Sequence, residues 1–289
     1  MEEKKIAVRK MQDYIETHLH ESITIKQLSN CCYLSPSYAA KIFKELTGYT
    51  PYYYIKACRL SEAAKALRDL DLKVIEVALD FVFDSHEGFT RAFSKQFGVP
   101  PKSYALRKPP IKWFLPYPLT IKKEEDVTMN QFIFTQVIDR PKRKALIKRG
   151  ITATEYFKYC EEVGCDVWGT LMSVKEALYE PIGMWLPDML IKPGTSEYVQ
   201  GVEVPLDYDN VIPEGFELID LPASQIMIFQ GQPYDDNDFE SEIVSVMDAI
   251  KAFKPALYGY EFYNKETPRF QLEPRGERGY IEGRPIRKL

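Results

Sequence analysis

Residues 83–104 read FDSHEGFTRAFSKQFGVPPKSY, and this stretch decides the fold of the first third of the chain. Apolar residues recur at helical spacing, at Phe89, Ala92, Phe93 and Phe97, so the segment predicts a helix with one buried face. The Gly-x-x-Pro that follows, residues 98–101, suits a helix that ends in a left-handed residue and cannot continue through the proline.

The same pattern occurs 50 residues earlier in the chain. Each copy reads as a helix, a tight turn, a second helix and Gly-x-x-Pro, which is the pattern of a helix-turn-helix unit. The residues that match between the copies are Ile25/Ile75, Ser35/Ser85, Phe43/Phe93, Gly48/Gly98, Pro51/Pro101 and Tyr54/Tyr104. Residues 51–69 between the copies predict a helix of about 17 residues, a strut about 25 Å long.

The exposed face of each second helix carries polar side chains. Arginine can bind guanine with two hydrogen bonds and glutamate can accept one from cytosine, whereas lysine suits phosphates. A solvated charged face is the alternative, but Lys41 and Arg91 occupy matching positions in the two copies. Residues 1–108 also hold 17 Lys+Arg against 13 Asp+Glu, and residues 109–289 hold 21 against 29, so a polyanionic partner is expected for the first part only.

Residues 5–107 resemble the AraC/XylS-type DNA-binding domain, through ITIKQLSNCCYLSPSYAAKIFKEL and VIEVALDFVFDSHEGFTRAFSKQFGVPPKSY. The resemblance implies two helix-turn-helix units that occupy adjacent major grooves of asymmetric double-stranded DNA. Gly88 departs from the larger residue usual at its position. The base-reading positions carried over are Ser37, Tyr38, Ala40, Lys41, His86, Glu87, Gly88 and Arg91, and the expected phosphate contacts are Lys44, Thr90 and Lys95.

A proline-rich segment, KPPIKWFLPYP at 108–118, separates the two halves. Proline cannot donate a backbone hydrogen bond, so we expect an extended linker. The sequence predicts three parts: an all-α DNA-binding domain at 1–108, a linker at 109–127 and an effector-binding domain at 128–289.

The second half predicts an α+β domain made of a duplicated β-β-α-β-β unit. Ile138-Asp139-x-Pro141 recurs 81 residues later, and Tyr198-Val-Gln-Gly recurs as Tyr280-Ile-Glu-Gly. Residues 235–253 predict the helix of the second copy, because apolar residues form one stripe after an acidic start. Two packed copies are expected to leave a cleft between them.

This half resembles the GyrI-like effector-binding domain, through its two IDxP…G blocks and the strands EYVQGVEVP and GYIEGRPIRK. The domain order resembles the Rob-like subgroup of AraC-type regulators. The resemblance implies a cleft for a small aromatic, often cationic, effector. The acidic residue that usually faces the cation is displaced or lost here, where the strand PRFQLEP offers Gln271 and Glu273. Aromatic residues are equally typical of a core, so the expected cleft residues are candidates: Trp168, Trp185, Glu203, Tyr260 and Glu273.

Other function classes receive little support. Only three histidines occur, no HExxH, GxSxG or phosphate-loop motif is present, and no CxxC pair suggests zinc, so we expect no catalytic residue, metal or cofactor. The open alternatives for the second half are a protein-interaction module, with RNA polymerase as one candidate partner, or a carboxylate-dependent hydrolase. No signal peptide or membrane span is predicted, so the expected location is the cytoplasm.

Overall fold

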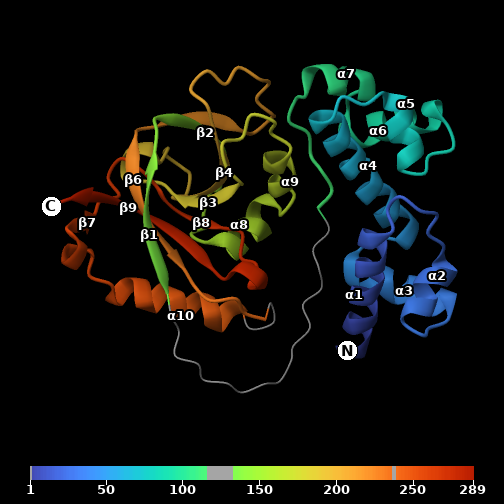
Figure 1. Ribbon diagram of the computed structural model, residues 1–289, viewed down its shortest axis with the longest axis horizontal. Coiled ribbons are helices and arrows are strands. Elements are labelled where there is room, and N and C mark those ends of the chain that lie inside the picture. Colours follow the sequence, from blue (N-terminus) through green and yellow to red (C-terminus); the bar gives the residue numbers. More distant parts are fainter. Residues whose placement is uncertain (1, 116–132, 236–238) are drawn as a thin grey trace. The chain divides into compact units, whose positions relative to one another are not determined.

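Helices form the first part of the chain and an antiparallel sheet the second (Figure 1). The computed structural model describes residues 2–115, 133–235 and 239–289. They divide into two compact units, a helical unit within Met1–Lys122 and a sheet unit within Lys123–Leu289. In the described ranges, no helix combines the length and apolar character that crossing a membrane requires.

The helical unit contains seven helices in its described part, and the two predicted helix-turn-helix units are among them. The helices are α1 (Glu2–Thr17), α2 (Ile25–Cys31), α3 (Pro36–Thr47), α4 (Pro51–Asp69), α5 (Val74–Asp80), α6 (His86–Phe97) and α7 (Pro101–Arg107).

Local sequence explains where α3 and α6 begin and end. The side chains of Ser35 and Ser85 cap the two N-termini by accepting hydrogen bonds from the amides of Tyr38 and Gly88. Gly48 and Gly98 end them in the left-handed region, with φ of 78° and 71°. The expectation of two bounded second helices is therefore confirmed.

Helix α4 spans 19 residues, close to the predicted strut, and packs against helices of both helix-turn-helix units. Ten of its residues are buried, so its position is set by packing along its length. The first unit buries Ile42 and Phe43 completely, and the second buries Phe89 and Phe93 completely. These side chains hold the opposite faces of α3 and α6 outward.

Residues 109–115 form no helix or strand, as expected of a linker, yet they pack on the helical unit. Trp113 is only 5% exposed and lies beneath the guanidinium of Arg68, 4.6 Å from the ring centroid. The Phe114 amide donates to the Ser61 hydroxyl at 2.8 Å. The start of the expected linker is thus docked, whereas residues 116–127, and 128–132 of the expected effector domain, lie outside the described residues.

The sheet unit is built on a nine-stranded antiparallel sheet in the order β1-β6-β9-β8-β3-β4-β2-β5, with β7 paired to β9. The strands are β1 (Phe134–Arg140), β2 (Arg143–Arg149), β3 (Ile182–Trp185), β4 (Tyr198–Val204), β5 (Glu217–Leu221), β6 (Ser224–Gln230), β7 (Tyr260–Phe262), β8 (Arg269–Leu272) and β9 (Ile281–Lys288). The helices are α8 (Tyr156–Val163), α9 (Val167–Met172) and α10 (Phe239–Ala252), with short 3-10 turns at Asp188–Leu190, Pro255–Tyr258 and Gly276–Arg278.

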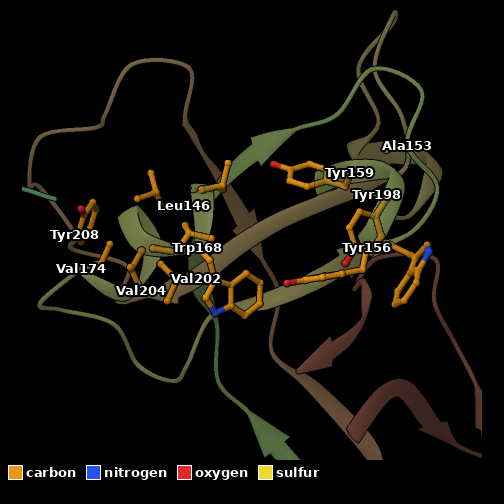
Figure 2. Close-up of a cluster of buried hydrophobic side chains, with 13 residues drawn as sticks. Leu146, Ala153, Tyr156, Tyr159, Trp168, Val174, Tyr198, Val202, Val204 and Tyr208 are labelled. Carbon is orange, nitrogen blue, oxygen red and sulfur yellow. The ribbon is translucent and has the colours of Figure 1, made fainter. Parts of the chain in front are cut away.

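Strand pairing assigns each core cluster to one face of this sheet. Helices α8 and α9 cover a cluster that includes Trp168, Trp185 and Tyr198 (Figure 2), and α10 covers a second cluster on the same face around Phe229. A third cluster, including Met184 and Phe270, occupies the opposite face. The expected α+β architecture is confirmed, with two differences: two short helices stand where one was predicted, and β7 is additional.

Candidate functional site

Helix α3 presents the polar face that the sequence predicted. Ser37, Tyr38 and Lys41 are exposed, and Ala40 is half-buried. The Lys41 ammonium lies 3.8 Å from the Glu45 carboxylate, in an exposed pair that leaves the lysine able to exchange partners. Because the side chains of Ser37 and Ala40 are short, only Tyr38 and Lys41 of these four residues are long enough to extend far from the helix surface.

Helix α6 presents the matching face with larger charged groups. His86, Glu87 and Arg91 are exposed, and within the described residues Arg91 forms no salt bridge. A Cβ added at Gly88 would lie 3.0 Å from the capping oxygen of Ser85, so the absent side chain keeps this N-cap uncrowded. Tyr38 occupies the equivalent position of α3 beside the same kind of serine cap, so this contact alone does not explain the glycine.

The expected phosphate contacts divide into two groups. Lys44 and Lys95 lie exposed in the last turns of α3 and α6. Thr90 is less accessible than Lys44 and Lys95, because it is half-buried and its enclosed hydroxyl oxygen has no hydrogen-bond partner among the described residues. It lies three residues before the fully buried Phe93, so it borders the packed side of α6.

The candidate effector residues do not form one group. Trp185 and Trp168 belong to the cluster under α8 and α9, and the Trp185 indole donates to the Thr154 carbonyl at 2.9 Å. Tyr260, on β7, is half-buried against the cluster under α10. Glu273 follows β8 and pairs with Arg275 at 2.7 Å.

Glu203 is the clearest departure from the expected cleft. It pairs across β2 with Ala145, which puts its side chain on the opposite face from Trp185. It is 1% exposed and lies between Arg140 and the Arg143 guanidinium, whose Nε is 2.7 Å from Glu203 Oε1. The structure therefore corrects the expectation that Glu203 and Trp185 line one groove.

A row of buried polar side chains crosses the helix-covered face between the two apolar clusters. Gln200, Gln271 and Glu282 are 1%, 7% and 0% exposed, and they are joined in register through Gly183. The row lies beside Trp185 and Arg269, whose guanidinium is 4.0 Å from the indole centroid. We call these three residues the polar row.

Two tyrosines flank the polar row. Burial raises the pKa of both the Tyr198 and the Tyr280 hydroxyl well above the usual range, so both hydroxyls stay protonated. The Tyr280 hydroxyl donates to Glu282 at 3.2 Å, and Arg284 Nε donates to the other carboxylate oxygen at 2.8 Å. Among the described residues, the hydroxyl of Tyr198 and the amide oxygen of Gln200 have no hydrogen-bond partner.

Two surface cavities of the sheet unit lie away from the polar row. One, of about 460 Å³, is lined by Asp139–Pro141 and Ala223–Gln225. The other, of about 250 Å³, shares Ala223–Gln225 and extends to Thr267 and Ile286. Arg140 connects the first cavity to the Glu203 ion cluster.

The sequence repeat predicted two members of the polar row, because it makes Gln200 and Glu282 equivalent and places them symmetrically about the expected cleft. Tyr198 and Gln200 align with Tyr280 and Glu282 in the offset repeat of the second half. A matched polar pair inside otherwise apolar strands is informative, because buried polar groups are expensive unless they are hydrogen-bonded.

Comparison with known proteins identifies the helical unit. Residues 28–107 match the family model described as a helix-turn-helix domain. The Right origin-binding protein of Escherichia coli is 35% identical over 97 residues, 34% of each chain, so this chain spans about a third of that relative. A probable AraC family transcriptional regulator from Rhodopseudomonas palustris is 30% identical, over 35% of this chain and 96% of that one, with a TM-score of 0.34.

The helical unit also accounts for most of a much shorter relative. The probable transcription factor PqrA of Proteus vulgaris is 36% identical over 93 residues, which cover 32% of this chain and 76% of that protein. The duplicated motif, its capped second helices and this coverage agree, and the chain belongs to the AraC-type helix-turn-helix transcriptional regulators.

Proposed function

We propose that this regulator binds one asymmetric DNA site as a single chain, with α3 and α6 in successive major grooves. The observation that carries the proposal is the matched exposure of Lys41 and Arg91 on two helices whose opposite faces are buried. Arg91 suits guanine and Glu87 suits cytosine, whereas Lys44 and Lys95 suit the flanking phosphates.

The strut α4 gives this proposal a geometric consequence. A 19-residue helix spans about 28 Å, and it packs against helices of both units. We expect footprinting on a selected site to show two protected major-groove segments about 10 base pairs apart, without a palindrome. Protection of a palindrome by an obligate dimer would overturn the proposal.

We further propose that residues 128–289 form a GyrI-like, duplicated effector-binding domain, with residues 1–108 as the DNA-binding domain. The strand order supports the duplication: exchanging β1 with β5, β2 with β6, β3 with β8 and β4 with β9 reproduces the same sheet in reverse. Three of these exchanges follow the offset of 81 or 82 residues seen in the sequence, β3 and β8 are 87 residues apart, and the axis falls between β3 and β8.

The polar row beside Trp185 is the proposed place of the effector, and binding there requires the covering side chains to move, because Trp185 and all three residues of the row are at most 8% exposed. An unpartnered buried oxygen costs about 1–3 kcal/mol, and both Gln200 and Tyr198 carry one. A bound molecule with a donor for Gln200 and an aromatic ring for Trp185 would recover part of this cost. An aromatic amide or amine has both features.

Fluorescence of the full chain tests this effector site. We expect the cation tetraphenylphosphonium or a naphthalene sulfonate, used as aromatic probes, to change tryptophan emission saturably. Trp185→Phe is expected to remove most of the response and Trp168→Phe, its matched control in the same cluster, to keep it. A response that Trp185→Phe retains would move the site elsewhere, and no saturable response to either probe would favour the protein-interaction alternative.

A further inference from the structure

The turns that join the helices of the two helix-turn-helix units contain an unusual backbone conformation. Tyr33, between α2 and α3, has φ of 56°, and Val82, between α5 and α6, has φ of 62°. Glycine reaches this left-handed region without steric cost, whereas a side chain there crowds its own backbone, most of all a β-branched one.

Hydrogen bonds impose this conformation on both turns. The Leu34 amide donates to the Ser29 carbonyl at 2.9 Å, and the Phe83 amide donates to the Ala78 carbonyl at 2.9 Å. This is the six-residue closure of a Schellman helix end, in which the residue before the donor must be left-handed. Both units therefore hold a strained residue two positions after their first helix ends, and the turn of the second unit is one residue longer before its N-cap.

The side chains of the two strained residues differ in how much apolar surface they bury. Val82 is half-buried, so its side chain recovers apolar packing within the unit. Tyr33 is 94% exposed, more than any other large hydrophobic residue in the described part of the chain. Its strain is not offset by burial, and strain of this kind persists where a residue serves function.

We propose that Tyr33 contacts the DNA backbone beside the groove that α3 reads. This inference rests on the proposed DNA binding. Tyr33 lies two residues before Ser35, the N-cap of α3, and the N-terminal end of a reading helix is the end nearest the base edges. Its hydroxyl can donate to a phosphate oxygen, as tyrosine hydroxyls do in protein–DNA complexes.

The side chains of the first helix-turn-helix unit are consistent with an uncharged contact from Tyr33 to the DNA backbone. Ser37 and Ala40 are small and offer few base contacts, so α3 needs positioning from neighbouring groups. A tyrosine hydroxyl fixes the register of the helix without adding a charge, so it releases no counterion when it binds.

The test compares four full-length chains: wild type, Tyr33→Gly, Tyr33→Phe and the matched control Val82→Gly. Affinity is measured by titration of a selected duplex and of a random-sequence duplex across a range of salt concentrations. Tyr33→Gly relieves the left-handed strain and loses no buried packing, so it is expected to raise the melting temperature by a few degrees. Val82→Gly relieves the same strain but also loses the packing of a half-buried side chain, so its melting temperature is expected to rise less. Tyr33→Phe keeps the strain and should leave the melting temperature unchanged.

Affinity separates the two strained positions. Tyr33→Gly and Tyr33→Phe are expected to bind both duplexes about five- to tenfold more weakly, with an unchanged salt slope, because one neutral phosphate contact is lost. Val82→Gly should bind as wild type does. Wild-type affinity in the two Tyr33 variants would overturn the inference, and so would a loss confined to the selected duplex, which would indicate base reading.

The random-sequence duplex also separates this inference from the proposed function. A wild-type chain that prefers no sequence would refute the site-specific reading by α3 and α6. A uniform loss in the Tyr33 variants would still support the backbone contact in that case.

Discussion

Glu203→Ala is expected to destabilise the sheet unit by about 3–5 kcal/mol, because it leaves two buried arginines without their shared carboxylate. The guanidinium of Arg140 also lies 3.5 Å from the ring centroid of Tyr179, but an aromatic face cannot replace a carboxylate as its partner. Hydrogen exchange of the β2 and β4 amides in the full chain measures the loss where these strands pair.

The control for this variant is an exposed ion pair in the same unit. Glu261 pairs with Arg287, and their side chains are 42% and 56% exposed, so Glu261→Ala should cost no more than about 1 kcal/mol. Equal small losses for Glu203→Ala and Glu261→Ala would show that the buried cluster contributes no more than a surface pair.

The helices of the first unit could be predicted because their signals are local. Glycines 48 and 98, the proline at 51 and the spacing of phenylalanines define α3, α4 and α6 within the chain itself. The polar faces of α3 and α6 followed from the same spacing, since burial of Phe43 and Phe93 turns the opposite side outward. The same reasoning predicted an exposed Thr90, but this residue borders the buried side of α6 and is half-buried.

Two features of the helical unit could not be predicted from local patterns. Tyr33 and Val82 occupy positions where glycine is the usual signal, so the left-handed turns are invisible in the sequence. The proline-rich segment predicts extended chain, but whether extended chain docks depends on tertiary packing, which places Trp113 beneath Arg68.

In the sheet unit, strand existence was predictable and side-chain direction was not. Alternation puts Tyr198 and Glu203 on opposite faces of β4, but only the pairing of β4 with β3 shows that Trp185 shares the face of Tyr198. A carboxylate expected beside Trp185 therefore lies in a buried ion cluster, and the polar row takes its place beside the indole.

Arg91→Ala is expected to weaken binding to the selected site by about 1–3 kcal/mol and to relax specificity at one base pair. The arginine is exposed on α6 and free of salt bridges within the described residues, so it can form two hydrogen bonds to one guanine. The Arg91→Ala variant should lose much less affinity for random-sequence duplexes than for the selected site.

Lys95→Ala is the matched control, one turn further along the same helix. It should weaken binding to all sequences alike and flatten the salt dependence by about one unit of slope, because it removes a phosphate contact. The direct test of site reading by this chain is therefore the affinity of wild type, Arg91→Ala and Lys95→Ala for every single-base variant of the selected site. The account predicts that Arg91→Ala loses discrimination at one position and Lys95→Ala at none; equal losses on all sequences for both variants would contradict it.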